Sequence, residues 1–262
     1  MGKTPLATAI VAAVEDPDRP GPAWDVACDV AARTRLPMTS LHVEIDPGDG
    51  IEALVDAIVA QVDPESLLVV ATEHASRWSG KYSVAERLVD HRSGLTVVVG
   101  SQCWSRAGSE KRGGPIVVAT DASAEAGAVV APAMRLAAAY SVGLQLTRVV
   151  SREEASAAGT RSGAADHLAA QVASLAVDQV GQADHAPVTG RLLVANDHVA
   201  ALVAEATARS SPFIALASHG DRTVARSTMS RTSSGLADEA SCPVLIAHPI
   251  TDGHDPDRAR RC

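Results

Sequence analysis

The stretch Phe213–Ile246, FIALASHGDRTVARSTMSRTSSGLADEASCPVLI, decides the fold class of this chain. It begins with a short apolar run, enters a polar loop at Ser218, crosses a short helical segment and ends in a second apolar run that begins at Cys242. Strand, loop, helix, strand is the building unit of a doubly wound, Rossmann-like parallel sheet. In such a unit the loop after a strand can hold an anion at the N-terminus of the next helix.

The composition of the whole chain agrees with this α/β interpretation. Its 262 residues are 46% hydrophobic but only 2% aromatic, so the core has to be built from Ala, Val, Leu and Ile, as in parallel sheets covered by helices. A formal net charge of -8 argues against a nucleic-acid-binding protein. No apolar run approaches the length of a membrane span, and the four cysteines show neither zinc-ligand nor disulfide-framework spacing. We therefore expect a cytoplasmic protein without a metal, a membrane partner or a nucleic-acid partner.

Apolar periodicity divides the chain into two similar parts. We predict a first domain over residues 1–100, a Ser/Gly-rich linker over 101–114, a second domain over 115–249 and a tail over 250–262. The strands and helices expected in the first domain are, in order, Ala9–Val14, Ala23–Arg35, Met38–Val43, Ile51–Val62, Leu67–Ala71, Val84–His91 and Leu95–Val99. Those expected in the second are Ile116–Thr120, a helix spanning Val129 to Tyr140, Leu144–Val150, Ala164–Gly181, Val188–Val194, Val199–Ala208, Phe213–Ala217, Thr232–Ala240 and Pro243–His248.

The two parts align with two different offsets. Leu41-His42-Val43 matches Arg148-Val149-Val150 at an offset of 107, and Ala53-Leu54-Val55 matches Ala201-Leu202-Val203 at an offset of 148. Some forty residues, equivalent to one helix and one strand, are therefore missing from the first domain. If each sheet has the strand order 3-2-1-4-5, the missing strand is the edge one, and four contiguous strands remain.

The chain from Ala9 to His248 resembles the universal stress protein family, with two family domains in tandem. The resemblance is carried by the segment Val117–Ser123, which resembles the V-x-x-D-x-S signature of the first strand, by Ser218-His219-Gly220 after the fourth strand, and by Cys242-Pro243-Val244-Leu245 at the last strand. It implies a five-stranded parallel sheet, a role in stress adaptation without enzymatic activity, and pairing of two domains across their last strands. In a tandem chain that pair can form internally, with a homodimer as a further expectation.

Family members that bind ATP carry G-x2-G-x9-G-[ST] after the fourth strand, where glycines let backbone N–H groups approach the phosphates. In this chain the pattern runs from Ala217 through Gly220 to Ser230 and Arg231, so only the middle glycine is retained. Arg222, Arg226 and several hydroxyl groups keep the loop favourable for an anion.

The resemblance implies that an adenine nucleotide, ATP or cyclic AMP, binds in the second domain. The residues expected to contact it are Asp121, Val149, Ser218, His219, Gly220, Ser230 and Arg231. Two simpler interpretations stay open at this stage: Asp121 caps the next helix, and Val149 is an ordinary core residue. His219 is read as a turn residue, because no catalytic partner stands near it in the sequence.

In the first domain the equivalent loop, Thr72–Ser83, lacks the glycines, and Glu73 would repel phosphate. Glu15 or Asp16 would match Asp121 there. Two functions outside nucleotide binding remain. One is a nucleotide-independent interaction or dimerisation scaffold. The other, a hydrolase of the wider adenine-nucleotide group, ranks last because Asp121-Ala122-Ser123 lacks the Gly-rich loop that it needs.

Overall fold

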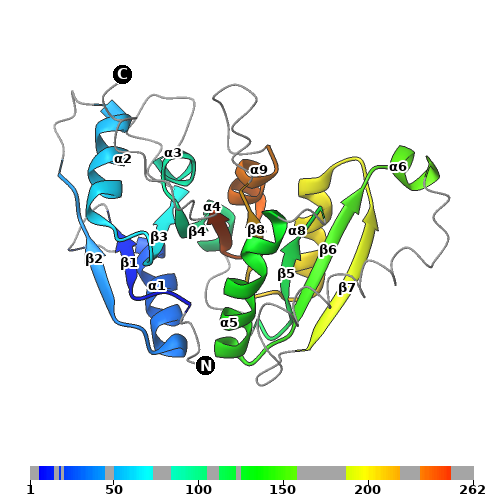
Figure 1. The fold of residues 1–262 in the computed structure, drawn as a ribbon, viewed down its shortest axis with the longest axis horizontal. Helices are drawn as coiled ribbons and strands as arrows, with labels where there is room; N and C mark the ends of the chain where they lie inside the picture. Colours follow the sequence, from blue (N-terminus) through cyan, green and yellow to red (C-terminus); the bar gives the residue numbers. More distant parts are fainter. Residues whose placement is uncertain are drawn as a thin grey trace.

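The fold is seen in a computed structural model of the chain (Figure 1). The structure describes residues 6–14, 18, 21–44, 50–72, 84–104, 112–121, 125–157, 187–218 and 231–248. The predicted helix over Ala164–Gly181 and the predicted tail over 250–262 lie outside these residues, as does most of the loop that follows Ser218.

The first part of the chain alternates strands and helices closely as its apolar periodicity predicts. The elements are β1 Ile10–Ala13, α1 Gly21–Thr34, β2 Met38–Leu41, α2 Gly50–Gln61, β3 Leu67–Ala71, α3 Val84–His91, β4 Gly94–Val99 and α4 Ser101–Trp104. The prediction of a linker from residue 101 onward is wrong at its start, because α4 is helical there. Gly100 permits this: a Cβ atom on it would lie 2.0 Å from the backbone oxygen of Ala237, so α9 packs directly on the chain before α4.

The second part of the chain is longer. Its elements are β5 Ile116–Ala119, the 3-10 helix η2 Glu125–Val129, α5 Val130–Tyr140, β6 Leu144–Val150, α6 Arg152–Ala157, β7 Val188–Val194, α8 His198–Ala208, β8 Ile214–Ala217, α9 Arg231–Glu239 and β9 Val244–His248. Asp197 caps α8, accepting a hydrogen bond from the backbone N–H of Ala200 at 3.0 Å. The short helix α6 was not predicted.

All strands of the described residues belong to one nine-stranded sheet, with the order β2-β1-β3-β4-β9-β8-β5-β6-β7. We call β2, β1, β3 and β4 the first half-sheet and the other five strands the second half-sheet. Each half is parallel, and the two halves meet where β4 and β9 pair antiparallel, with Gly94 opposite His248. Counted along the chain within the second half-sheet, its order is 3-2-1-4-5, and the first half-sheet has the same order without strand 3.

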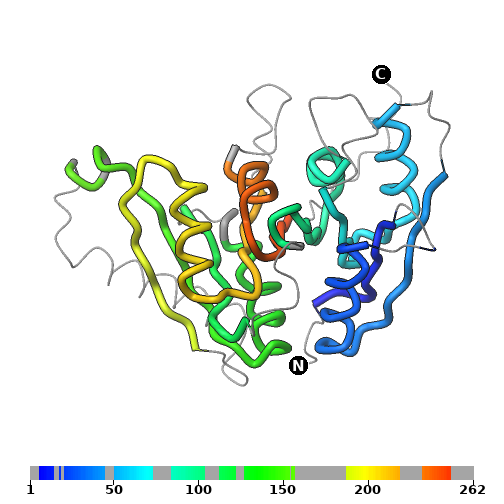
Figure 2. The backbone as a smooth tube through the Cα atoms, turned by 180° about the vertical axis from the view of Figure 1, so that it is seen from behind, coloured from blue at the N-terminus to red at the C-terminus, as the bar shows by residue number. Residues whose placement is uncertain are grey.

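Helices cover both faces of this sheet (Figures 1 and 2). One face packs against α1 and α5, and the other against α2, α3, α8 and α9; on each face the buried apolar side chains form a single cluster that runs through both half-sheets. Alternate residues of β9 belong to different clusters, with Leu245 on the α1 and α5 face and Ile246 on the opposite face. The chain is therefore a three-layer α/β/α structure whose core does not stop at the junction of the halves.

The strands correct the offset between the two parts of the chain. Ile10 pairs with Met38, and Ile116 pairs with Leu144, so the register between the first two strands is the same in both parts. Ile10 and Ile116 begin their strands and lie in the same cluster, on the α1 and α5 face, so equivalent residues are 106 apart, not 107. The error of one residue matters because successive side chains of a strand point to opposite faces. With the corrected offset, Glu15 rather than Asp16 is the counterpart of Asp121. The offset of 148 between the two later helices agrees with the starts of α2 and α8.

Candidate functional site

Three of the predicted site residues lie at the carboxyl ends of neighbouring strands. β5 pairs with β6 at an offset of 28 as far as Ala119 and Thr147, and the same register continued along the chain sets Asp121 level with Val149. β5 pairs with β8 at an offset of 97 as far as Val118 and Ala215, and that register continued sets Asp121 level with Ser218. We call Val149, Asp121 and Ser218 the edge row.

The backbone ladder continues up to this row. The N–H of Thr120 donates to the carbonyl oxygen of Thr147 at 3.0 Å, and the N–H of Ser218 donates to that of Ala247 at 2.9 Å. Asp121 is exposed, Val149 is half-buried against the cluster on the α8 and α9 face, and Ser218 is 8% exposed. The row therefore combines an accessible carboxylate with a partly covered hydroxyl and an apolar neighbour.

The edge row stands at the carboxyl ends of the strands, where the chain changes direction across the sheet. From β5 the chain proceeds to β6 on one side, and it returns to β8 on the other side. In open α/β sheets this topological switch point is the usual ligand position, because the loops above the two strands separate and leave a crevice. Parallel strands lie about 4.8 Å apart, so side chains of one row can contact the same small ligand.

The remaining predicted site residues belong to the segment between β8 and α9. Arg231 is the first residue of α9, which covers the same face of the sheet that Val149 faces. His219, Gly220 and Ser230 lie outside the described residues, as do the cations Arg222 and Arg226. The continued register of the strands therefore sets Val149, Asp121 and Ser218 level with one another, and most of the predicted phosphate loop lies outside the described residues.

The same row continues to a residue that the sequence analysis did not single out. Ile214 pairs with Val244, an offset of 30, so Ser218 stands opposite His248 at the end of β9. Burial, followed by the positive charge of Arg92, lowers the pKa of His248 to about 4. The imidazole is therefore neutral at physiological pH. A histidine at the end of the last strand was visible in the sequence, but its arginine neighbour comes from the other half-sheet.

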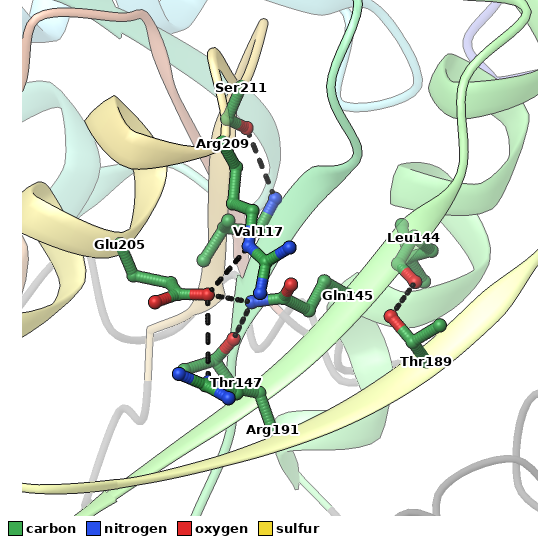
Figure 3. Close-up of polar contacts among 9 residues, drawn as sticks. All are labelled: Val117, Leu144, Gln145, Thr147, Thr189, Arg191, Glu205, Arg209 and Ser211. Carbon is green, nitrogen blue, oxygen red and sulfur yellow. Dashed lines mark hydrogen bonds and ion pairs between the residues drawn. The ribbon is translucent and has the colours of Figure 1, made fainter.

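A polar cluster also missed by sequence analysis lies under α8 (Figure 3). Nε2 of Gln145 on β6 donates to Oε1 of Glu205 at 2.9 Å and to Oγ1 of Thr147 at 3.1 Å. The same carboxylate oxygen accepts from Nε of Arg209 at 3.0 Å, and Nε of Arg191 on β7 lies 3.7 Å from it.

The neighbouring side chains of this cluster lower the pKa of its carboxylate, Glu205. Desolvation opposes ionisation of Glu205, but the hydrogen bonds from Gln145 and Arg209, together with the charges of Arg191 and Arg209, outweigh it and lower the pKa of Glu205. Gln145 and Thr147 are 4% and 1% exposed, so the amide and the hydroxyl are closed to a ligand, whereas Arg191 and Arg209 are exposed. Its residues join β6, β7 and α8, and we assign it a structural role.

The equivalent edge of the first half-sheet has different chemistry. At the end of β2 the Nδ1 atom of His42 lies 3.2 Å from the carbonyl oxygen of Val14, and Nε2 lies 3.7 Å from Oε1 of Glu44. Glu15, the counterpart of Asp121, lies outside the described residues. The side chains described at this edge therefore include a carboxylate and a histidine, but they supply no permanent cation for a phosphate.

The residues that the structure describes form neither a metal-ligand cluster nor a membrane-spanning helix. Within those ranges, histidine, cysteine and carboxylate side chains do not gather in groups of three or more that could hold a metal ion. None of the helices that the structure describes is long and apolar enough to cross a membrane.

The geometry can now be compared with known proteins. Residues 114–248 match the universal stress protein family, whereas no curated protein matches in sequence. Among solved structures, a universal stress protein from Archaeoglobus fulgidus DSM 4304 is 11% identical, with a TM-score of 0.59 over 95% of this chain and 99% of that one. A functionally unknown protein from Pseudomonas aeruginosa PAO1 is 10% identical, with a TM-score of 0.50 over 93% of each chain.

A universal stress protein in complex with cAMP is 20% identical and has a TM-score of 0.40, covering 52% of this chain and 98% of that chain. The TM-scores of the Archaeoglobus fulgidus and Pseudomonas aeruginosa PAO1 structures support a shared fold with those two proteins. The family match covers more than half of the sequence, including β5, β8 and all three residues of the edge row. On that match, this chain belongs to the universal stress protein family.

Proposed function

We propose that this protein is a stress-response regulatory module that binds one adenine nucleotide, ATP or cyclic AMP, in its second domain and does not hydrolyse it efficiently. The observation that supports the proposal is the edge row: the register of β5 with β6 and with β8, continued past the paired residues, sets Asp121 level with Val149 on one side and with Ser218 on the other. The row stands at the topological switch point, directly before the loop that contains Gly220.

Each residue of the row suits one part of a nucleotide. The exposed carboxylate of Asp121 can accept hydrogen bonds from a ribose hydroxyl or from the adenine amino group, and Val149 offers an apolar contact to the base. The hydroxyl of Ser218 and the arginines of the following loop suit the phosphate end, since guanidinium groups bind phosphate oxygens in pairs. The loop retains one of the three family glycines, which supports binding without tight closure around the phosphates.

The first domain is proposed to be a structural partner. Its edge carries Glu44, and the sequence adds Glu15 and Glu73 near the place where phosphates would lie. Like charges would raise the energy of a bound phosphate there. We therefore expect one ligand per chain rather than two.

Isothermal titration calorimetry with ATP and cyclic AMP tests this function. We expect binding with a stoichiometry of one, weakened at least tenfold by Asp121→Asn, which keeps the size of the side chain but removes its charge. Asp56→Asn, at an exposed position of α2, is the matched control and should bind as the original protein does. Absence of heat at millimolar concentrations of both nucleotides would exclude the proposal.

Two observations favour a second function. The loop after β8 retains only one of the three family glycines, and the two half-sheets are joined within one chain. Because β4 and β9 already pair within one chain, the protein is an internal pseudo-dimer, and it could act as a nucleotide-independent scaffold that binds a protein partner or a second copy. Gly220→Trp separates the two functions, since residue 220 belongs in the sequence to the predicted phosphate loop and to neither β4 nor β9. A stress phenotype that is lost in this variant while assembly stays unchanged would count against the scaffold.

A further inference from the structure

We call the pairs from Gly94–His248 to Val98–Val244, together with Arg92 just before β4, the β4–β9 seam. Among the described residues, two buried nitrogen atoms at this seam have no hydrogen-bond partner: Nε2 of His248 and Nε of Arg92. Buried polar atoms are almost always hydrogen-bonded, so two exceptions at one junction require a physical reason.

Arg92 is held rigidly at this place. Its side chain donates from Nη1 to the carbonyl oxygen of Leu95 at 2.7 Å, and from Nη2 to those of Asp63 at 2.9 Å and Ser66 at 2.5 Å. The residue is 4% exposed. Because its guanidinium group satisfies carbonyl groups from two segments of the chain, it cannot turn away from His248 without breaking them.

The backbone at the seam is equally constrained. Gly94 has φ +100°, and a Cβ atom on it would lie 2.2 Å from the carbonyl oxygen of Pro64. The turn after α2 therefore presses against the start of β4. The start of β4, which pairs with His248, therefore has little room to shift.

The charges around His248 are unbalanced. Arg92 is the charged group that acts on it among the described residues, and Asp63, in the turn after α2, acts on Arg92. From β8 the neutral Ser218 stands opposite His248. The carboxylates of α9, Asp238 and Glu239, precede the start of β9, at the other end of the strand.

We propose that the β4–β9 seam is acid-sensitive: His248 is neutral while the half-sheets are joined, and its protonation beside the immobile Arg92 weakens their pairing. The inference does not depend on nucleotide binding. Protonation of His248 would still affect the candidate nucleotide site, because His248 continues the edge row next to Ser218. Acidification therefore loosens the sheet beside the candidate site.

Equilibrium unfolding in urea at pH 7.5 and pH 5 tests the proposal, with His248→Gln as the variant and His198→Gln, at an exposed position of α8, as the control. A histidine with pKa 6.5 in the unfolded chain and about 4 in the fold makes the unfolding constant rise about 30-fold between these two pH values. We expect His248→Gln to lose this rise and His198→Gln to keep it. Equal pH dependence of all three proteins would overturn the proposal.

A second measurement covers the case in which His248→Gln does not fold. NMR titration of the imidazole of His248 in the unmodified protein should give a midpoint below pH 5, accompanied by loss of β4 and β9 amide protection as the pH falls. A midpoint near 6.5, or unchanged protection through the titration, would refute the acid-sensitive seam.

Discussion

Gln145 and Glu205 form a partly buried amide–carboxylate pair, with Nε2 of Gln145 donating to Oε1 of Glu205 at 2.9 Å. The pair joins β6 to its covering helix α8, and Arg209 and Arg191 bring two positive charges to the same oxygen. The first part of the chain has Thr39 and Ala57 at the corresponding positions, given the offsets of 106 and 148. The pair therefore belongs to the second half-sheet alone.

Glu205→Ala should destabilise the protein by about 1–3 kcal/mol, because it leaves the buried Gln145 amide without its charged acceptor. Urea unfolding at pH 7 measures the change. Glu153→Ala, at an exposed position of α6, is the control and should lie within about 0.5 kcal/mol of the original protein. Since the pKa of Glu205 is lowered, its contribution is present above the ordinary value of 4.5 and is lost as the pH falls through the folded pKa.

Asp238→Asn should stabilise the protein slightly at pH 7. Burial raises the pKa of Asp238, and the carboxylates of Glu86 and Glu239 raise it further, so the charged form is disfavoured in the fold. Stability from this group is present at low pH and declines as the pH rises through the folded pKa. Because the side chain is largely exposed, we expect a gain of only a few tenths of a kcal/mol at low salt. A gain that persists at pH 3 or in high salt would contradict this explanation.

Tyr140→Phe should weaken the contact between α1 and α5 by about 0.5–1.5 kcal/mol. The hydroxyl of Tyr140 donates to Oδ2 of Asp29 at 2.5 Å, while the ring packs edge-on against Phe213, with centroids 5.3 Å apart. The substitution removes the hydrogen bond and keeps the ring. A double-mutant cycle with Asp29→Ala should show coupling between the two changes, and strictly additive losses would show that the bond contributes nothing.

Gly100→Ala should destabilise the protein by about 1–3 kcal/mol, because its Cβ would lie 2.0 Å from the backbone oxygen of Ala237. Thermal unfolding followed by circular dichroism measures the loss. Gly113→Ala is the matched control, since a Cβ there would have no neighbour within 4 Å among the described residues. If both variants unfold at the same temperature, α9 does not pack on residue 100 as closely as the structure shows.

Local sequence predicted most of the secondary structure. The strands Leu67–Ala71, Leu144–Val150 and Val188–Val194 and the helix Val84–His91 have the bounds expected from their apolar patterns. The prediction of a linker is wrong at α4, because Ser101–Trp104 opens a Ser/Gly-rich stretch whose local pattern does not indicate a helix. That helix packs against α9, a contact more than a hundred residues away that no local pattern reveals.

Some residues of the candidate site were likewise predicted from the sequence, and others were not. Asp121, Val149 and Ser218 were predicted one by one from the family resemblance, and strand register aligns them. His248 and the Gln145–Glu205 pair could not be predicted, because a polar residue in a strand is read as exposed until its partner is known. In both cases the partner comes from another element: Arg92 precedes β4, and Glu205 lies on α8.

The amino-acid sequence by itself determined the α/β class, the repeat and the missing edge strand, because apolar periodicity and turn residues act over a few neighbours. The family resemblance predicted that the halves pair across their last strands, and β4 pairs with β9 as expected, but only the tertiary structure decided the register of that pairing. The antiparallel pairing of β4 with β9 places Arg92 beside His248, and the register of β5 with β6 and β8 forms the edge row. The physical reason is that backbone hydrogen bonds between strands carry no side-chain signature, whereas a shift of one residue changes which side chains meet.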